Sequence, residues 1–395
     1  MCFSIIVEKM KEIQNILLDY LDNESESKEE LEHFIKILKD QNIVDDKHDF
    51  KLLLQLLIKI VNNHQRIRNF ISKTEQILEY FKKDIQKYFT NSEIFDIFGN
   101  NKIILLFLIE ENVFTIDEHI VSQIPNKRYA RKDYIEYFGP EIRPFITKEF
   151  IKKYWYRNIF LGKDDLFERI KNEVDGDFYE KRREGENDDY LCQLIRFNKI
   201  KEFVIFVEQT NLSLESKIKN SIFETNQLLA FNDDISLIEY ASFYGSNDII
   251  KYMQMKGVEL RSSMWIYAIH SRNAELIKYL EDNQVSPPYC NYETILNGYE
   301  RILNESIKCH HNEISNYIID NLIKKEDLQD KIENKYEYNL YRFAFEYSNY
   351  CFFPENMKHK NVFFYLCEFD YYTLVRLYLS EVSIDINAKV KPSIL

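Results

Sequence analysis

The chain has 395 residues, of which 45% are hydrophobic and 30% charged, a balance typical of a folded globular protein rather than a disordered one. Its formal net charge of −13 disfavours general nucleic-acid binding, because an acidic surface repels the phosphate backbone. Only 8 Gly and 7 Pro are present, which leaves little room for many β-hairpins or glycine-rich cofactor loops, so we expect helices.

The first 125 residues carry apolar side chains at helical spacing. Over residues 13–21, for example, apolar residues recur at intervals of three and four positions, which places them on one helical face. Asn91 and Ser92 are candidate caps for a helix over 93–98, because short polar side chains can accept the free amide protons of a first turn. We therefore predict an α-helical N-terminal region over residues 1–125.

Residues 126–187 show a weaker pattern. Pro125, Pro140 and Pro144 punctuate the chain at the start of this stretch and within it, and the end of the stretch is charged and contains glycine, so we predict a helical or irregular connector. The run 127–132 is the most basic stretch of the chain. It could serve as a nuclear address or a phosphate contact, but in so acidic a chain we favour a solvent-exposed loop.

A unit recurs after residue 188. Its clearest copies cover 236–260, 264–285 and 303–318. Each copy has a small residue in its first helix, where the helix can pack closely on its neighbour, and an acidic residue in the first turn of its second helix. The small residues are Ala241, Ala268 and Ser306, and the acidic residues are Asp248, Glu275 and Glu313. Because one such hairpin cannot bury its own apolar face, we expect the copies to stack over 188–387, with a tail at 388–395.

This unit resembles the ankyrin repeat. Residues 236–241 stand where that family has Thr-Pro-Leu-His-x-Ala, Gly245 matches its turn glycine, and residues 257–260 match its Gly-Ala-Asp-Val. The spacing departs from the family period of about 33 residues, since Ala268 follows Ala241 after 27 residues.

A closer resemblance is to the large set of ankyrin-repeat proteins of parasitic protists such as trichomonads. In these proteins a conserved domain of unknown function precedes or overlaps the repeats. The similar stretches are 221–226, 237–246, 265–270 and 305–312. The resemblance implies an all-α fold, a helical-hairpin solenoid of irregular ankyrin-like repeats preceded by the helical N-terminal region. It also implies a non-enzymatic scaffold or adaptor that binds a protein partner.

Three tyrosines are the candidate contact residues for that partner. Ankyrin geometry turns the positions of Tyr240, Tyr244 and Tyr267 toward the concave groove, with His270 and Ser271 beside them. Tyrosine combines a large contact area with a hydroxyl group, which is why it is enriched at binding hot spots. We therefore predict that these five residues bind protein; the alternative is that the rings pack between repeats.

Cys309-His310-His311 is the densest group of reactive side chains. Adjacent residues on a helix point about 100° apart, so a metal ion would need Cys309 together with a distant group, or the two histidines in a distorted turn. We favour a helix-to-turn segment here and predict no metal site. No glycine pattern for a nucleotide cofactor occurs, so no cofactor is expected.

Two other interpretations of the function stay open. One is an enzyme with an unrecognised active site in the N-terminal half, where His64 or His119 would meet an acid or Cys192. The other is a truncated structural member of an expanded family.

The acidic pair Asp188-Asp189 is better explained as a helix cap than as an acid–base catalyst.

The cysteines and the hydropathy pattern indicate the compartment. Six scattered cysteines without regular spacing are typical of reduced thiols in an intracellular, cytoplasmic protein. The longest apolar run, Ile103–Ile109, is far shorter than the roughly 20 residues that cross a bilayer, so no membrane span is expected. Whether Met1 or Met10 is the true start, the identity of the partner and the oligomeric state are left open.

Overall fold

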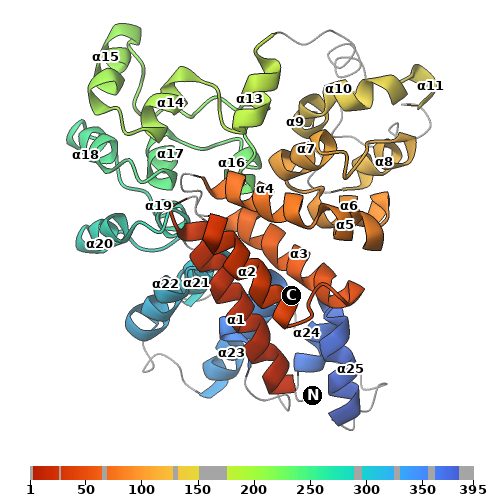
Figure 1. The fold of residues 1–395 in the computed structure, drawn as a ribbon. Coiled ribbons are helices and arrows are strands. Elements are labelled where there is room, and N and C mark those ends of the chain that lie inside the picture. Colours follow the sequence, from red (N-terminus) through yellow and green to blue (C-terminus); the bar gives the residue numbers. More distant parts are fainter. Residues whose placement is uncertain are drawn as a thin grey trace. The chain divides into compact units, whose positions relative to one another are not determined.

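The computed structural model describes residues 3–25, 28–64, 69–127, 132–150, 176–288, 296–323, 330–354 and 361–381. In this part of the chain the named elements are all helices, which confirms the expected all-α fold (Figure 1). None of the described helices combines the length and the apolar character needed to cross a membrane. Residues 128–131 of the basic run, residues 151–175 of the connector and the tail at 388–395 lie outside the described residues.

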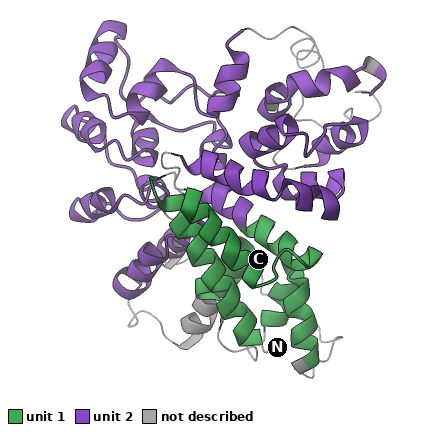
Figure 2. Ribbon diagram, viewed as in Figure 1, with its two compact units in different colours: residues 1–56, 324–395 green, residues 57–323 purple. Residues whose placement is uncertain are grey.

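The chain divides into two compact units, coloured separately in Figure 2. Unit 1 comprises residues 1–56 and 324–395, and unit 2 comprises residues 57–323. These units follow from the packing of the helices. Their boundaries differ from those of the segments 1–125, 126–187 and 188–387, which the sequence pattern predicts. The segments therefore remain a prediction about where the repeats begin and end.

Unit 1 joins the two ends of the chain. Gln14 of the first helix is fully buried; its side-chain oxygen accepts the backbone N–H of Tyr350 at 2.7 Å, and its amide donates to Asn349 Oδ1 at 3.0 Å. Because the oxygen and the nitrogen of this buried amide both have hydrogen-bond partners, the contact favours one specific packing of the first helix against residues 349–350. The helices of the unit are α1 (Phe3–Asp22), α2 (Lys28–Asp40), the start of α3 (Lys47–Asn63), α23 (Asp330–Tyr347), η7 (Tyr350–Phe352), α24 (Val362–Glu368) and α25 (Tyr372–Glu381).

The first part of unit 2 is a group of short helices around the buried α7. Every residue of α7 from Lys102 to Leu108 is buried, as the long apolar run in the sequence requires. The described helices here are α4 (Phe70–Tyr80), α5 (Lys82–Tyr88), α6 (Asn91–Phe98), α7 (Lys102–Glu110), α8 (Glu118–Gln123), η1 (Ile124–Asn126), α9 (Lys132–Tyr137), α10 (Gly139–Ile142), η2 (Arg143–Phe145), α11 (Lys148–Phe150) and α13 (Phe178–Glu184).

Helix α6 is capped by Thr90 rather than by Asn91 or Ser92. Thr90 Oγ1 accepts the N–H of Glu93 at 3.3 Å, and the Glu93 carboxylate accepts the N–H of Thr90 at 2.8 Å, which completes a capping box. Asn91 instead donates its side-chain amide to the carbonyl of Thr115 at 2.6 Å. The expected cap was therefore placed one or two residues too late.

The variant Thr90→Ala is expected to lower the free energy of unfolding by about 1 kcal/mol, because the backbone N–H of Glu93 in the first turn loses its acceptor. Urea denaturation followed by circular dichroism measures this change. The matched control is Ser92→Ala, which should leave the free energy of unfolding within about 0.5 kcal/mol of wild type. An equal loss in both variants would contradict the assignment of the cap.

Four helical hairpins follow one another in the described residues of unit 2 (Figure 1). In each hairpin the two helices contact each other, and the first helix contacts the first helix of the next hairpin. We call these hairpins the hairpin stack. Its members are α14 (Tyr190–Arg196) with α15 (Ile200–Thr210), α17 (Leu237–Phe243) with α18 (Asn247–Met255), α19 (Met264–His270) with α20 (Ala274–Asp282), and α21 (Leu296–Lys308) with α22 (Asn312–Tyr317). Helix α16 (Gln227–Ala230) lies between the first two hairpins in sequence, and η5 (Ile318–Leu322) follows the last.

Local sequence features explain how these hairpins form. Asp189 caps α14, accepting the N–H of Leu191 at 2.9 Å, as expected for this acidic pair. Gly245 turns the chain between α17 and α18 with a φ of +65°, a conformation that favours glycine. The small residues expected at the contacts between first helices are all 0% exposed, and they are Ala241, Ala268 and Ser306. Small side chains at these points allow the first helices to lie close together.

Candidate functional site

The structure buries most of the predicted contact residues. Tyr240, Tyr267, His270 and Ser271 are 0%, 4%, 1% and 4% exposed, and Tyr244 is partly buried. The rings of Tyr240 in α17 and Tyr267 in α19 are thus packed inside the unit, as the alternative interpretation expects. That these five residues bind a protein partner stays a prediction, and four of the five side chains are buried.

The same residues hold neighbouring segments together. The rings of Tyr240 and Tyr244 lie 4.9 Å apart, and the Tyr267 hydroxyl accepts a hydrogen bond from Asn232 Nδ2 at 3.0 Å. Ser271 Oγ lies 3.1 Å from the carbonyl of Ser242, to which it donates, and so connects the second hairpin to the third. Burial raises the pKa of Tyr240 and of Tyr244, so both phenols stay neutral. These contacts assign the predicted residues a role inside the stack.

Three reactive side chains meet where α19 contacts α21. Glu305 and Cys309 are four residues apart and so share one face at the end of α21, while His270 comes from the last turn of α19. His270 Nδ1 lies 3.1 Å from Glu305 Oε1 and 3.3 Å from Cys309 Sγ. Cys309 Sγ lies 3.5 Å from the same Glu305 oxygen. All three residues are buried, and we call them the His–Glu–Cys cluster.

The electrostatics of the cluster depend on burial and on Lys308. Burial by itself would raise the pKa of Glu305. The Lys308 ammonium, which lies 3.3 Å from Oε2, and the hydrogen bonds within the cluster have the larger combined effect and lower this pKa to about 2. Burial lowers the pKa of His270, and Glu305 offsets this only in part. Burial, reinforced by Glu305, raises the pKa of the Cys309 thiol. Near neutral pH the cluster therefore holds a carboxylate, a neutral imidazole and a protonated thiol.

A second layer of aromatic and imidazole rings surrounds the cluster. Phe243 stacks on the His270 ring with 4.8 Å between centroids, and His64 Nδ1 lies 2.5 Å from the carbonyl oxygen of Cys309. His311 Nε2 lies 3.2 Å from the carbonyl of His270, and its ring is 4.5 Å from that of His64. These contacts fix the backbone that carries both Cys309 and His270.

The expected helix-to-turn segment at Cys309-His310-His311 is present. Helix α21 ends at Lys308, α22 begins at Asn312, and His310 has a φ of +59°, as a turn residue does. The neighbours in sequence do not form the cluster. Cys309 instead meets His270 and Glu305, the distant-group arrangement that the sequence left as one possibility. Glu305 was missed, although its four-residue spacing from Cys309 was a signal that could have found it.

The cluster is not arranged as a nucleophile–base–acid triad. In such a triad the histidine contacts the nucleophile through one ring nitrogen and the acid through the other. Here Cys309 and Glu305 both face Nδ1 of His270. The raised pKa of the thiol also disfavours the reactive thiolate. A nitrogen, an oxygen and a sulfur that converge on one point instead form a donor set suited to a metal ion.

The residues weighed for an enzyme in the N-terminal half contact different neighbours. His64 contacts Cys309 as described, and exposed His119 contacts the side-chain amide of Gln123 at 2.8 Å. Cys192 is buried, and its burial, together with nearby Asp189, raises the pKa of its thiol to about 12. None of these contacts gives a residue an activated acid, base or nucleophile.

Comparison with known proteins gives no relative for this chain. No protein family, no curated protein and no solved structure matches it. The resemblance to ankyrin repeats and to the parasitic-protist proteins rests on the residues quoted above and stays a prediction.

Proposed function

We propose that this chain is a non-enzymatic scaffold or adaptor that binds a protein partner through the first hairpin of the stack. The observation that carries the proposal is the concentration of exposed apolar side chains on this hairpin. Tyr190, Phe197 and Ile205 are 55%, 64% and 53% exposed. Clustered exposed apolar groups, aromatic ones above all, are typical of surfaces that bind other proteins.

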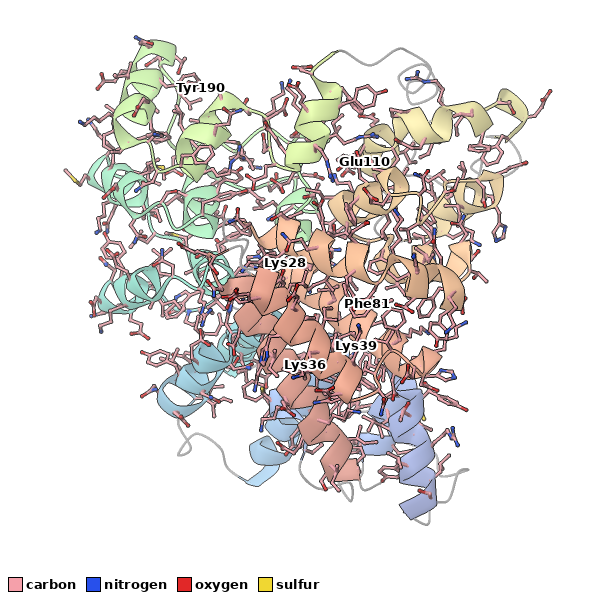
Figure 3. All side chains as sticks on the ribbon, viewed as in Figure 1. Lys28, Lys36, Lys39, Phe81, Glu110 and Tyr190 are labelled. Carbon is pink, nitrogen blue, oxygen red and sulfur yellow. The ribbon has the colours of Figure 1, made fainter. Side chains whose placement is uncertain are left out.

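Tyr190 is the first residue of α14, and Phe197 directly follows its last residue. They are seven residues apart, which is close to two helical turns, whereas Leu191, Leu194 and Ile195 between them are buried. Tyr190, labelled in Figure 3, is the first residue of the helix. The first hairpin therefore has one apolar face buried inside the unit and a second apolar face exposed to solvent.

Neighbouring side chains hold these two rings in place. Tyr190 packs edge-on against Phe206 of α15, with 5.6 Å between ring centroids. The Arg196 guanidinium lies 5.4 Å from the ring centroid of Phe197 and pairs with Glu186 at 2.6 Å. Aromatic rings held in this way lose little entropy on binding, which favours affinity. The partner that fits such a surface is a protein segment with apolar side chains.

The compartment and the partner class belong to the same proposal. We place the protein in the cytoplasm, and the free thiols among the described residues support this because they suit a reducing compartment. The acidic net charge supports a protein partner over a nucleic acid.

Affinity capture with surface variants tests the proposal. The tagged full chain, carried as wild type and as Tyr190→Ser with Phe197→Ser, is used to capture proteins from its native cells. The double variant should lose the specific partner by at least about tenfold, because it removes two aromatic anchors. Thermal unfolding of both proteins checks that the fold is unchanged.

The matched control is Met255→Ser, which removes an apolar side chain that is 85% exposed on a different hairpin. It should capture the partner as wild type does. Equal capture by wild type and the double variant would contradict the proposal, as would a wild-type protein that captures nothing above an unrelated helical protein.

A further inference from the structure

We propose that His270, Glu305 and Cys309 bind one transition-metal ion of the zinc type between α19 and α21. This inference is independent of the partner surface on the first hairpin. It rests on three donor atoms of different kinds, His270 Nδ1, Glu305 Oε1 and Cys309 Sγ, which converge on one buried point from two hairpins of the stack.

The distances between the donor atoms match a tetrahedral site. Zinc bonds of about 2.3 Å to sulfur and about 2.0–2.1 Å to nitrogen and oxygen place the ligand atoms about 3.3–3.6 Å apart. The observed separations are 3.3 Å between sulfur and nitrogen, 3.5 Å between sulfur and oxygen, and 3.1 Å between nitrogen and oxygen. An ion at their common centre needs only small side-chain adjustments.

The charges of the cluster also suit a divalent cation. Lys308 pairs with Oε2 of Glu305, and the other carboxylate oxygen, Oε1, faces His270 and Cys309. On binding, the Cys309 thiol releases its proton to solvent and becomes a thiolate. His270 coordinates through Nδ1, the nitrogen that faces Glu305 and Cys309, and its one ring proton then resides on Nε2. The dication, thiolate and carboxylate then sum to zero net charge, which lowers the cost of burial.

The donor set selects the class of metal. A thiolate and an imidazole are soft and borderline ligands that favour zinc, cobalt or nickel over magnesium and calcium, which prefer oxygen. With three protein ligands the fourth position takes a water molecule or another small ligand. Bound in this way, the ion connects the third hairpin to the fourth and stabilises the folded stack by mass action.

Cobalt titration of the wild-type full chain tests the site directly. After treatment with a chelator, the protein is titrated with cobalt(II), which gives a thiolate-to-metal charge-transfer band and intense visible bands in a tetrahedral site. We expect one equivalent to bind and zinc to displace it. The variants Cys309→Ser and His270→Gln should weaken binding by roughly 100-fold or more. Cys192→Ser, a buried cysteine of the same unit outside the cluster, should bind as wild type does.

A second measurement on the wild-type protein covers the case in which a variant does not fold. Zinc should slow alkylation of Cys309 at least about tenfold, because the bound thiolate is protected and the stack opens less often. Exposed Cys367 of unit 1 is the internal control and should react at the same rate with and without zinc. The proposal is overturned if no charge-transfer band forms, if the band persists in Cys309→Ser, or if zinc does not protect Cys309.

Discussion

Replacement of Tyr240 by alanine is expected to lower the free energy of unfolding by about 3–5 kcal/mol, the usual cost of removing a buried aromatic ring. Tyr240 is 0% exposed in the middle of α17, and its ring packs against that of Tyr244. The cavity left behind would lie between first helices that contact each other along the stack. Urea denaturation followed by tryptophan fluorescence measures the loss, since Trp265 is buried in α19.

The control for this prediction is Tyr190→Ala, which removes an exposed tyrosine and should change the free energy of unfolding by less than about 0.5 kcal/mol. The pair of variants separates two roles for tyrosine in the stack. If Tyr240→Ala kept full stability but lost the partner, Tyr240 would be a groove contact after all, as its sequence position suggested.

The second large effect is expected at a buried ion pair in the first part of unit 2. Arg182 is 4% exposed, and its guanidinium donates to both oxygens of Glu141 at 2.8 and 3.0 Å and to the carbonyl of Tyr137 at 3.1 Å. Removing the carboxylate leaves a buried positive charge without its counterion. Glu141→Ala should therefore lower the free energy of unfolding by about 3–5 kcal/mol in the same urea titration.

An exposed ion pair gives the matched control. Lys251 and Glu275 lie 2.9 Å apart with about half or more of each side chain exposed, so solvent screens their attraction. Glu275→Ala should leave the free energy of unfolding almost unchanged. A Glu141→Ala variant that is no less stable than Glu275→Ala would show that the Arg182 charge is solvated.

Local features of this fold could be predicted from the sequence because they depend on neighbours along the chain. The helical spacing of apolar residues gave the all-α class, and Asp189 and Gly245 marked a cap and a turn of the stack. Thr90 shows the limit of such signals, since three consecutive polar residues compete to cap α6. The choice among them is made by contacts from Thr115, farther along the chain.

Long-range contacts could not be predicted in the same way. The bond between Gln14 and Tyr350 joins residues 336 positions apart, and no pattern in the sequence marks it. Tyr240 occupies a first-helix position that suits either a groove or the packing between repeats, and only the neighbouring helices decide. His270 and Glu305 are 35 residues apart, so their meeting depends on how two hairpins stack.

Hydrogen–deuterium exchange of the full chain, measured with and without the captured partner, tests the central claim most directly. We expect slower exchange on binding across residues 190–210, the first hairpin, where the rings of Tyr190 and Phe197 are exposed. Unchanged exchange across that hairpin, with protection confined to other helices, would contradict it.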